Sequence, residues 1–362
     1  MMITFILLIA TLALAVLLFM QQAVFGNNPS GEKLKRAESS ANYNQGVFQN
    51  VEPTEVMRKE ASTVKVLKDF LNKPANTVPT QALPSMHTDL SSLAGDVPTI
   101  VWFGHSSYFI KSKDLAILVD PVFSGHASPI SIFGKEFPGT NVYSVKEMPA
   151  IDILVLTHDH YDHLDYETIQ QLHSKVKRIV APLGVDAHLE HWGVPAEKIT
   201  ALDWWESGSI RDSVTLTAVP ARHFSGRGFA RGKTLWSAFV LNIHGYSIFI
   251  GGDSGYDSQF KKIGEKFGPF DIALLECGQY GDDWPSIHML PEEVPVAAKD
   301  LGAKVLMPVH WAKFALAYHA WNEPIERLLE MAEQHQVRVV TPKIGEPLLV
   351  GKSMPTEKWW QQ

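Results

Sequence analysis

The sequence contains a dense group of side chains that can bind metal ions. Positions 158–163 carry three histidines and two aspartates. Imidazole and carboxylate groups are ligands that suit Zn²⁺. The five side chains cannot all face one way on a regular helix or strand, so we expect this segment to form a tight loop. In such a loop His158 and His160 point to one metal, while Asp162 and His163 point to another. A solvated polar loop is the alternative, which five potential ligands in six residues disfavour.

Three further potential ligands follow later apolar runs. His223 comes after the run that ends at Ala221, Asp253 follows two glycines at the end of another run, and His310 follows a third. Each of them alone is compatible with a polar residue that caps a strand. Together with the cluster at 158–163 they indicate a site with two metal ions, because such sites draw ligands from several loops.

Short apolar runs that end in Gly, Pro or Asp indicate the strands that position these side chains. Helical patterns separate some of the later runs. The sequence therefore predicts a layered α/β architecture of two mixed sheets with helices outside. The predicted strands are residues 99–103, 115–119, 151–157, 213–219, 237–243, 246–250, 272–275, 304–307 and 337–340, and the predicted helices are 166–176, 257–267, 291–301 and 323–335.

The chain divides into three parts by composition. Residues 26–97 are rich in polar residues and proline and contain one amphipathic pattern at 55–71. Proline-punctuated, polar segments are typical of connections. We expect 26–97 to be an arm that wraps the main domain, which we place at 98–362.

Residues 1–25 form a hydrophobic N-terminal segment. The first twenty residues are apolar apart from two threonines and have no preceding Lys or Arg. As a helix they would be about 30 Å long, close to the thickness of a bilayer core. We predict a membrane anchor, with a cleaved secretory signal and a periplasmic or secreted body as the alternative. Lys33, Lys35 and Arg36 follow the segment and favour a cytoplasmic body.

The composition excludes some classes of protein. The formal net charge of -7 argues against a nucleic-acid-binding surface, which needs basic residues to neutralise phosphates. Cys277 is the single cysteine in 362 residues, so an intrachain disulfide is impossible. With 45% hydrophobic residues, the chain can build a large core without such a cross-link. The sequence does not predict an oligomeric state.

The cluster resembles the His-x-His-x-Asp-His signature of the metallo-β-lactamase superfamily. It looks most like the branch of N-acyl-phosphatidylethanolamine-hydrolysing phospholipase D and its bacterial relatives. The supporting segments are Asn42–Asn50, Gly104–Ser107, Leu118–Phe123, Leu202–Glu206, Pro220–His223, Gly252–Tyr256, His288–Glu293 and His310–Phe314. The resemblance implies a four-layer αββα sandwich with the hydrophobic helix added at its N-terminus.

The resemblance also implies a set of metal ligands. The first zinc ion is expected at His158, His160 and His223, and the second at Asp162, His163 and His310, with Asp253 bridging the two. Manganese or iron is compatible with the same ligands. Asp162 and Asp253 are also expected to orient the nucleophile, and His288 is expected to contact substrate or assist proton transfer.

A two-zinc site predicts hydrolysis by a metal-bound hydroxide. The leading interpretation is a phosphodiesterase that acts on a phospholipid at a membrane. One alternative is a metal-dependent lactonase or ester hydrolase that acts on a soluble metabolite. Another is a membrane-tethered protein that binds metal without catalysis.

Several other residues are weaker candidates. Asp120 is expected to hold a ligating imidazole, and His105 to line the site. Arg227 and Lys313 could receive a phosphate or carboxylate, and His319 resembles His288 in its loop position. Five further histidines are expected at the surface without a role, and they are His173, His188, His191, His244 and His335.

Overall fold

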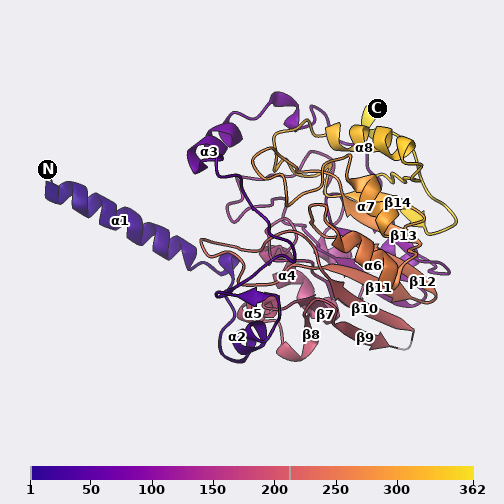
Figure 1. Ribbon diagram of the computed structural model, residues 1–362, viewed down its shortest axis with the longest axis horizontal. Helices are drawn as coiled ribbons and strands as arrows, with labels where there is room; N and C mark the ends of the chain where they lie inside the picture. Colours follow the sequence, from indigo (N-terminus) through magenta and orange to yellow (C-terminus); the bar gives the residue numbers. More distant parts are fainter. Residues whose placement is uncertain (1, 212) are drawn as a thin grey trace.

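Two mixed β-sheets form the framework of the protein. The computed structural model describes residues 2–211 and 213–362 (Figure 1). One sheet has seven strands in the order β15-β3-β4-β5-β6-β7-β8, and the other has six in the order β14-β13-β12-β11-β10-β9. The α/β class predicted from the sequence is therefore confirmed.

The seven-stranded sheet is buried on both faces. Ile100 and Trp102 of β3 belong to one apolar core, while the alternating Val101 belongs to a second core on the opposite face. Strands β5 to β8 pair in parallel, and the pairs among β15, β3, β4 and β5 are antiparallel. The strands are β3 (Thr99–Trp102), β4 (Tyr108–Ser112), β5 (Leu115–Val119), β6 (Ile151–Val155), β7 (Val176–Pro182), β8 (Ile199–Leu202) and β15 (Pro347–Leu349).

The six-stranded sheet combines an antiparallel meander with a parallel half. Strands β9 to β12 pair antiparallel, and β12, β13 and β14 pair in parallel. Strands β10, β12, β13 and β14 therefore run in the same direction, and their carboxyl ends share one edge. The strands are β9 (Ser207–Arg211), β10 (Val214–Val219), β11 (Ala238–Ile243), β12 (Tyr246–Ile250), β13 (Ile272–Glu276) and β14 (Leu306–Val309).

Helices cover the sheets. Ile169 and Leu189, from helices α4 and α5, lie in the second core with residues of the seven-stranded sheet. Helix α7 contacts β13, and α6 and α8 contact α7. These helices are α4 (Tyr166–Leu172), α5 (Val185–His191), α6 (Gln259–Phe267), α7 (Val294–Asp300) and α8 (Glu323–Gln334). Four of them were predicted, with ends up to a few residues longer, and α5 was not.

Residues 23–97 lie along the main body. Helix α2 (Gly31–Glu38) contacts α5, where Lys33 forms an ion pair with Glu190 at 2.8 Å. Phe48 of the short β1–β2 hairpin (Tyr43–Asn44 and Val47–Phe48) is buried in the first core, and its N–H donates to the Gly232 carbonyl. Helix α3 (Thr63–Leu71) occupies only part of the range predicted as helical. The boundaries proposed at 25/26 and 97/98 stay a prediction.

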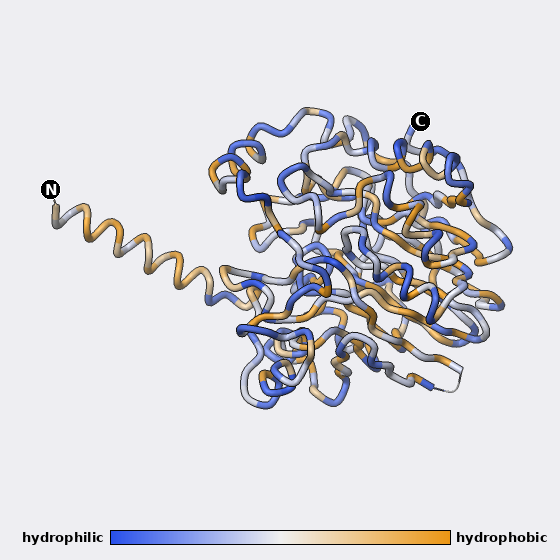
Figure 2. The backbone as a smooth tube through the Cα atoms, in the orientation of Figure 1, coloured by the Kyte–Doolittle hydropathy of each residue, from blue (hydrophilic) through white to orange (hydrophobic). Residues whose placement is uncertain are grey.

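The N-terminal segment forms helix α1 (Met2–Met20), which projects away from the body (Figure 1) and is apolar along most of its length (Figure 2). Its 19 residues extend over about 28 Å. Within the described residues, no helix combines the length and apolarity needed to cross a membrane. The prediction of a membrane-spanning anchor in residues 1–25 is therefore not supported.

Seven short 3₁₀ helices complete the described elements. They are Ala23–Phe25, Ala75–Thr77, Leu90–Ser92, Val145–Glu147, His173–Lys175, Ala196–Lys198 and Trp359–Gln361. The last of these places Trp359 against Trp102 and Trp311, with ring centroids 6.3 and 5.3 Å apart. The C-terminus therefore closes the core beneath the loop that carries His310.

A buried carboxylate at the start of α6 predicts a pH-dependent stability. Asp257 accepts a hydrogen bond from the Gln259 N–H at 2.9 Å, and burial raises its pKa to about 6. The folded state thus holds this proton more tightly than the unfolded chain, so stability falls as pH rises from about 4 to 6. Asp257→Asn keeps the acceptor and removes the charge.

We expect Asp257→Asn to raise the free energy of unfolding at pH 7 by about 1–3 kcal/mol. The gain should shrink as the pH approaches 4, where the wild-type carboxyl is protonated in both states. Urea unfolding of the wild type and the Asp257→Asn variant at pH 4.5 and pH 7 measures this difference in free energy. An equal difference at the two pH values would contradict this account of Asp257.

Candidate metal centre

The loop after β6 brings the imidazoles of His158 and His160 together with that of His223, which comes after β10. His158 Nε2 lies 2.9 Å from His160 Nδ1, which lies 3.2 Å from His223 Nε2. One ligand atom from each of these histidines falls within 4.8 Å of the others. His158 and His223 are buried. The structure therefore assembles the group predicted for the first metal.

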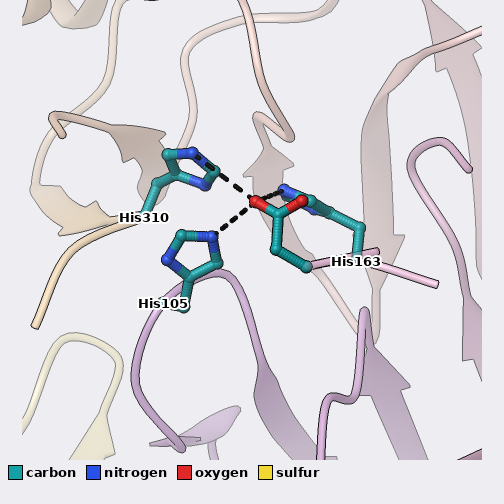
Figure 3. A group of neighbouring side chains, drawn as sticks. His105, His163 and His310 are labelled. Carbon is teal, nitrogen blue, oxygen red and sulfur yellow. Dashed lines mark hydrogen bonds and ion pairs between the residues drawn. The ribbon is translucent and has the colours of Figure 1, made fainter. Parts of the chain in front are cut away.

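A second group surrounds the carboxylate of Asp162. Its Oδ2 lies 2.8 Å from His105 Nε2, 3.5 Å from His163 Nε2 and 4.0 Å from His310 Nε2. Figure 3 shows the imidazoles of His105, His163 and His310 arranged around this carboxylate. The three residues predicted for the second metal thus lie together, and His105, predicted only to line the site, is in contact with one of them.

Asp253 lies between the two groups. Its Oδ2 is 3.8 Å from His158 Nε2 and 3.7 Å from His223 Nε2. Its Oδ1 is 3.2 Å from His163 Nε2 and 3.0 Å from His310 Nδ1. A carboxylate in this position can contact metal ions on both sides.

The turn before Asp253 depends on glycine. Gly252 has φ +59°, and a Cβ there would lie 3.0 Å from the Cβ of Thr157. A side chain on Gly251 would meet the Leu274 carbonyl oxygen at 2.6 Å. Both positions therefore require a residue without Cβ for β12 to deliver Asp253 beside the loop after β6.

The chemistry of these side chains fits metal ions. His163 Nε2 and Asp253 Oδ1 are buried and form no hydrogen bond, although both face the cluster. Such atoms are rare in folded proteins and need an explanation. Burial holds the pKa of His158, His223 and His310 well below the usual value. Their imidazoles are therefore neutral, which is the form that binds metal.

The two carboxylates are ionised. Burial alone would raise the pKa of Asp162 and Asp253, but His163 and neighbouring histidines lower both well below the ordinary value. The same two carboxylates raise the pKa of His163 despite its burial. Two buried negative charges at one place form an environment that favours divalent cations.

Asp120 orients the imidazole of His163 through the ring nitrogen that does not face the cluster. The Nδ1–H of His163 donates to Asp120 Oδ2 at 2.8 Å, which leaves Nε2 facing the cluster. Asp120 also accepts from the Thr157 N–H at 2.8 Å and from the Thr157 hydroxyl at 2.6 Å. The structure therefore places Asp120 as the sequence predicted, and these bonds fix the start of the loop as well as one ring.

We expect Asp120→Asn to weaken metal binding by about 10–100-fold, because an amide cannot hold the His163 ring as a carboxylate does. Competition with a fluorescent chelator measures the affinity. Asp152→Asn, on the same sheet but away from the cluster, is the control. If Asp120→Asn bound metal as tightly as the wild type, the hydrogen bond to His163 would have no positioning role.

The N-terminal arm also positions a ring of the cluster. Asn50 Nδ2 donates to the His223 carbonyl at 2.8 Å, and the His223 N–H donates to Asn50 Oδ1 at 3.0 Å. The ring of His223 is held by its Nδ1–H, which donates to the Ile287 carbonyl at 2.9 Å. The role of Asn50 was missed because 173 residues separate it from His223.

His288 lies at the cluster with a partner that sequence reasoning missed. Its Nδ1–H donates to Glu276 Oε2 at 2.6 Å, and its ring centroid is 5.0 Å from that of His223. Burial opposes protonation of His288, but Glu276 raises its pKa to about 9. Glu276 is the last residue of β13, and an acidic residue that ends an otherwise apolar strand was the available signal.

Other predicted candidates have structural partners. Lys313 is fully buried and donates to the carbonyls of Phe103 and Val122, so it cannot receive a substrate anion. Arg227 is also buried and donates to three backbone carbonyls, those of Val24, Asp159 and Leu164. The weaker predictions for Lys313 and Arg227 are therefore wrong.

Two further histidines differ from their predicted places. His319 accepts a hydrogen bond from the Gln279 N–H, which leaves it outside the cluster. His188 is not at the surface: it is buried, and its ring lies between the Asn27 N–H and Asp159 Oδ2. His188 thus connects the segment after α1 to the loop that carries His158 and His160.

A cavity of about 270 Å³ opens over the cluster, and we call it the catalytic lobe. Its floor includes His160, Asp162, His223, Asp253, His288 and His310. Its walls are largely apolar and come from the N-terminal arm, α3 and later loops. These wall residues include Val56, Met57, Val66, Phe224, Trp284, Ile287 and Leu316.

Known proteins share this sequence and fold. Residues 116–311 match the family described as "Beta-lactamase superfamily domain". An uncharacterized protein of Mycobacterium tuberculosis is 37% identical over 335 residues, which cover 90% of this chain and 88% of the relative. N-acyl-phosphatidylethanolamine-hydrolyzing phospholipase D 1 of Caenorhabditis elegans is 30% identical over 263 residues, which cover 68% of this chain and 74% of the relative.

A solved structure shows the same fold. The crystal structure of CmlA, a diiron beta-hydroxylase from Streptomyces venezuelae, aligns with a TM-score of 0.54 and 17% identity over 70% of this chain and 54% of that chain. An identity this low supports the fold alone. Because one fold hosts different metals and reactions, it does not choose the metal.

The family match over residues 116–311, together with the cluster of histidines and aspartates at the edge of two packed mixed sheets, assigns the protein to the class of metal-dependent hydrolases. Within this class, the chain belongs to the metallo-β-lactamase superfamily, whose domain spans residues 116–311 and whose members include its phospholipase D relatives.

Proposed function

We propose that the protein is a phosphodiesterase that cleaves a phospholipid, with two zinc ions as its metals. The observation that carries this proposal is the apolar wall of the catalytic lobe directly above the histidines and aspartates. The similarity to the phospholipase D of Caenorhabditis elegans supports it. A polar floor under apolar walls suits a substrate with a charged headgroup and a hydrocarbon portion.

The proposed ligand sets follow the geometry of the two groups. His158, His160 and His223 would hold one zinc ion, and Asp162, His163 and His310 would hold the other, with Asp253 lying between the two groups. When bound, two such ions supply an activated water and neutralise charge on the phosphoryl oxygens. The ionised carboxylates of Asp162 and Asp253 accept hydrogen bonds from the attacking water and orient it toward phosphorus.

His288 is proposed to serve the leaving group. Its Nδ1 is held by Glu276, so Nε2 is the nitrogen that remains for substrate, and the ring lines the catalytic lobe. A proton on Nε2 can pass to the leaving oxygen as its bond to phosphorus breaks. Glu276 fixes the ring orientation and stabilises the protonated imidazole.

The surface beside the lobe favours a lipid substrate over a soluble one. Helix α3 exposes three apolar side chains, with exposed fractions of 77% for Val64, 57% for Leu67 and 70% for Leu71. Spacings of three and four residues place them on one face of the helix. Val66 of the same helix lines the lobe. An apolar face of this kind can enter a lipid surface and hold the lobe at it.

Hydrolysis by the full, zinc-loaded chain tests the proposal. We expect cleavage of N-acyl-phosphatidylethanolamine in vesicles, with little turnover of lactones. Leu67→Ser with Leu71→Ser should lower the rate on vesicles about 10-fold and spare a soluble phosphodiester. Ile132→Ser, at an exposed apolar position away from the lobe, is the control. Turnover of lactones alone would favour the lactonase, and metal binding without any turnover would favour a non-catalytic protein.

A further inference from the structure

A second cavity adjoins the catalytic lobe. It measures about 250 Å³, and we call it the arm lobe because the arm residues Val47, Phe48, Pro53 and Thr54 line it. The two lobes share the four lining residues Val56, His223, Phe224 and Arg231. The two lobes therefore adjoin at these residues, and Arg231 lies at their junction.

Arg231 differs in its contacts from the other basic residues near the site. Among the described residues that line the two lobes, it is the single Lys or Arg. Its guanidinium carbon lies 5.1 Å from the ring centroid of Phe224. Across the described chain it has no hydrogen bond or ion pair with an acidic side chain, whereas Arg227 is fully occupied by backbone carbonyls.

Phe224 connects Arg231 to the metal cluster. The Phe224 ring centroid lies 4.5 Å from that of His160 and 5.0 Å from that of His223. The Phe224 ring thus contacts both the guanidinium of Arg231 and the imidazoles of two proposed metal ligands. Stacking on a ring restricts an arginine side chain and leaves its N–H donors available.

The arm lobe carries little negative charge that would repel an anion, and the two aspartates of the catalytic lobe are the carboxylates that the proposed metal ions would balance. Glu52, the acidic side chain of the arm lobe, accepts a hydrogen bond from the Ser258 hydroxyl at 2.6 Å and so already has a partner. Arg231 has no acidic partner and lies at the junction of two largely apolar cavities. This setting suits a ligand with a phosphate group for the guanidinium and hydrocarbon groups for the cavities. Guanidinium binds phosphate through paired, charge-assisted hydrogen bonds.

We propose that Arg231 binds the phosphate of an anionic amphiphile at the junction of the two lobes and determines the preference of the site for such substrates over neutral esters. This role rests on the proposed function and adds a specificity-determining residue to it. The arm lobe then accommodates a part of the substrate that the catalytic lobe does not hold.

Calorimetric binding to the zinc-loaded full chain tests the role of Arg231. The probes are dodecyl phosphate, inorganic phosphate and the neutral dodecyl maltoside. We expect Arg231→Met to weaken dodecyl phosphate binding about 10–100-fold and to leave dodecyl maltoside binding within about 2-fold. Arg231→Lys should recover part of the loss. Arg338→Met, at an exposed site outside both lobes, should change nothing.

The outcomes separate the possible ligands. Equal weakening for dodecyl phosphate and inorganic phosphate supports recognition of the anion alone, and weakening for dodecyl phosphate alone supports recognition of the amphiphile. Unchanged dodecyl phosphate binding, or an equal loss for the neutral detergent, would overturn the proposal.

Kinetics add a second readout. Arg231→Met should raise KM for bis(p-nitrophenyl) phosphate with little change in kcat, because the contact exists in the bound ground state. A wild-type protein without phosphodiesterase activity would contradict the proposed function. The binding comparison would still decide the role of Arg231, since it requires no turnover.

Discussion

Asp253→Ala is expected to lower kcat on the order of 1,000-fold and to reduce metal content at the same time. The carboxylate of Asp253 lies between the two histidine groups, within 3.8 Å of His158 Nε2 and 3.0 Å of His310 Nδ1. Alanine would remove a carboxylate that contacts both sides and leave the converging imidazoles with one fewer negative charge to balance a cation. Metal analysis and initial rates on the same sample measure both effects.

Asp114→Ala is the matched control for this variant. Asp114 is an exposed aspartate paired with Arg211 at 2.9 Å, away from the cluster. It should keep full metal content and rate. If Asp253→Ala retained both metal and activity, Asp253 would not bridge the two groups and the proposed arrangement of ligands would be wrong.

His288→Asn is expected to lower kcat about 100-fold while metal content stays unchanged. Asparagine retains a group that can hydrogen-bond Glu276 but cannot donate a proton to a leaving oxygen. The loss should be small for a substrate with an activated leaving group such as p-nitrophenolate, because that group departs without protonation. Comparison of a p-nitrophenyl ester of phosphate with an alkyl phosphodiester measures the difference.

Glu276→Gln and His319→Asn complete the test of His288. Glu276→Gln keeps the hydrogen bond but removes the charge, so we expect an intermediate loss. His319 lies outside the cluster, and its substitution should leave kcat unaltered. If His288→Asn lost metal in proportion to activity, His288 would be a metal ligand and its proposed role in proton transfer would be contradicted.

The positions of the seven proposed ligands could be predicted because each follows a strand. The apolar runs that form β6, β10, β12 and β14 are encoded locally, and strands that run in one direction end at one edge of a sheet. Asp253 could be expected beside His163 for this reason, although 90 positions separate them. Asp120 was predictable on the same ground, since it directly follows β5.

The partners of the ligands could not be predicted in the same way. Asn50 reaches His223 only because the arm folds back over the main body, and no local pattern encodes that path. His105 approaches Asp162 through a left-handed backbone conformation, with φ 52°, at a position without glycine. Glu276 was hidden in an apolar strand whose burial argued against an acidic residue with a role.

Basic residues were misinterpreted for a physical reason. Arg227 and Lys313 are charged, so sequence analysis expects their side chains to face solvent or to bind substrate. In the structure both side chains instead satisfy backbone carbonyls that the loops leave unpaired. Arg231, four residues after Arg227, has no such carbonyl partner in the described chain, and this difference is visible only in three dimensions.

The dependence of lipid hydrolysis on metal occupancy tests the central claim most directly. The metal-free full chain is titrated with zinc, and the release of phosphatidic acid from N-acyl-phosphatidylethanolamine vesicles is followed. The account predicts no hydrolysis without metal and a rate that reaches its plateau at about two zinc ions per chain. Hydrolysis that is independent of metal, or its absence at full occupancy, would contradict the account.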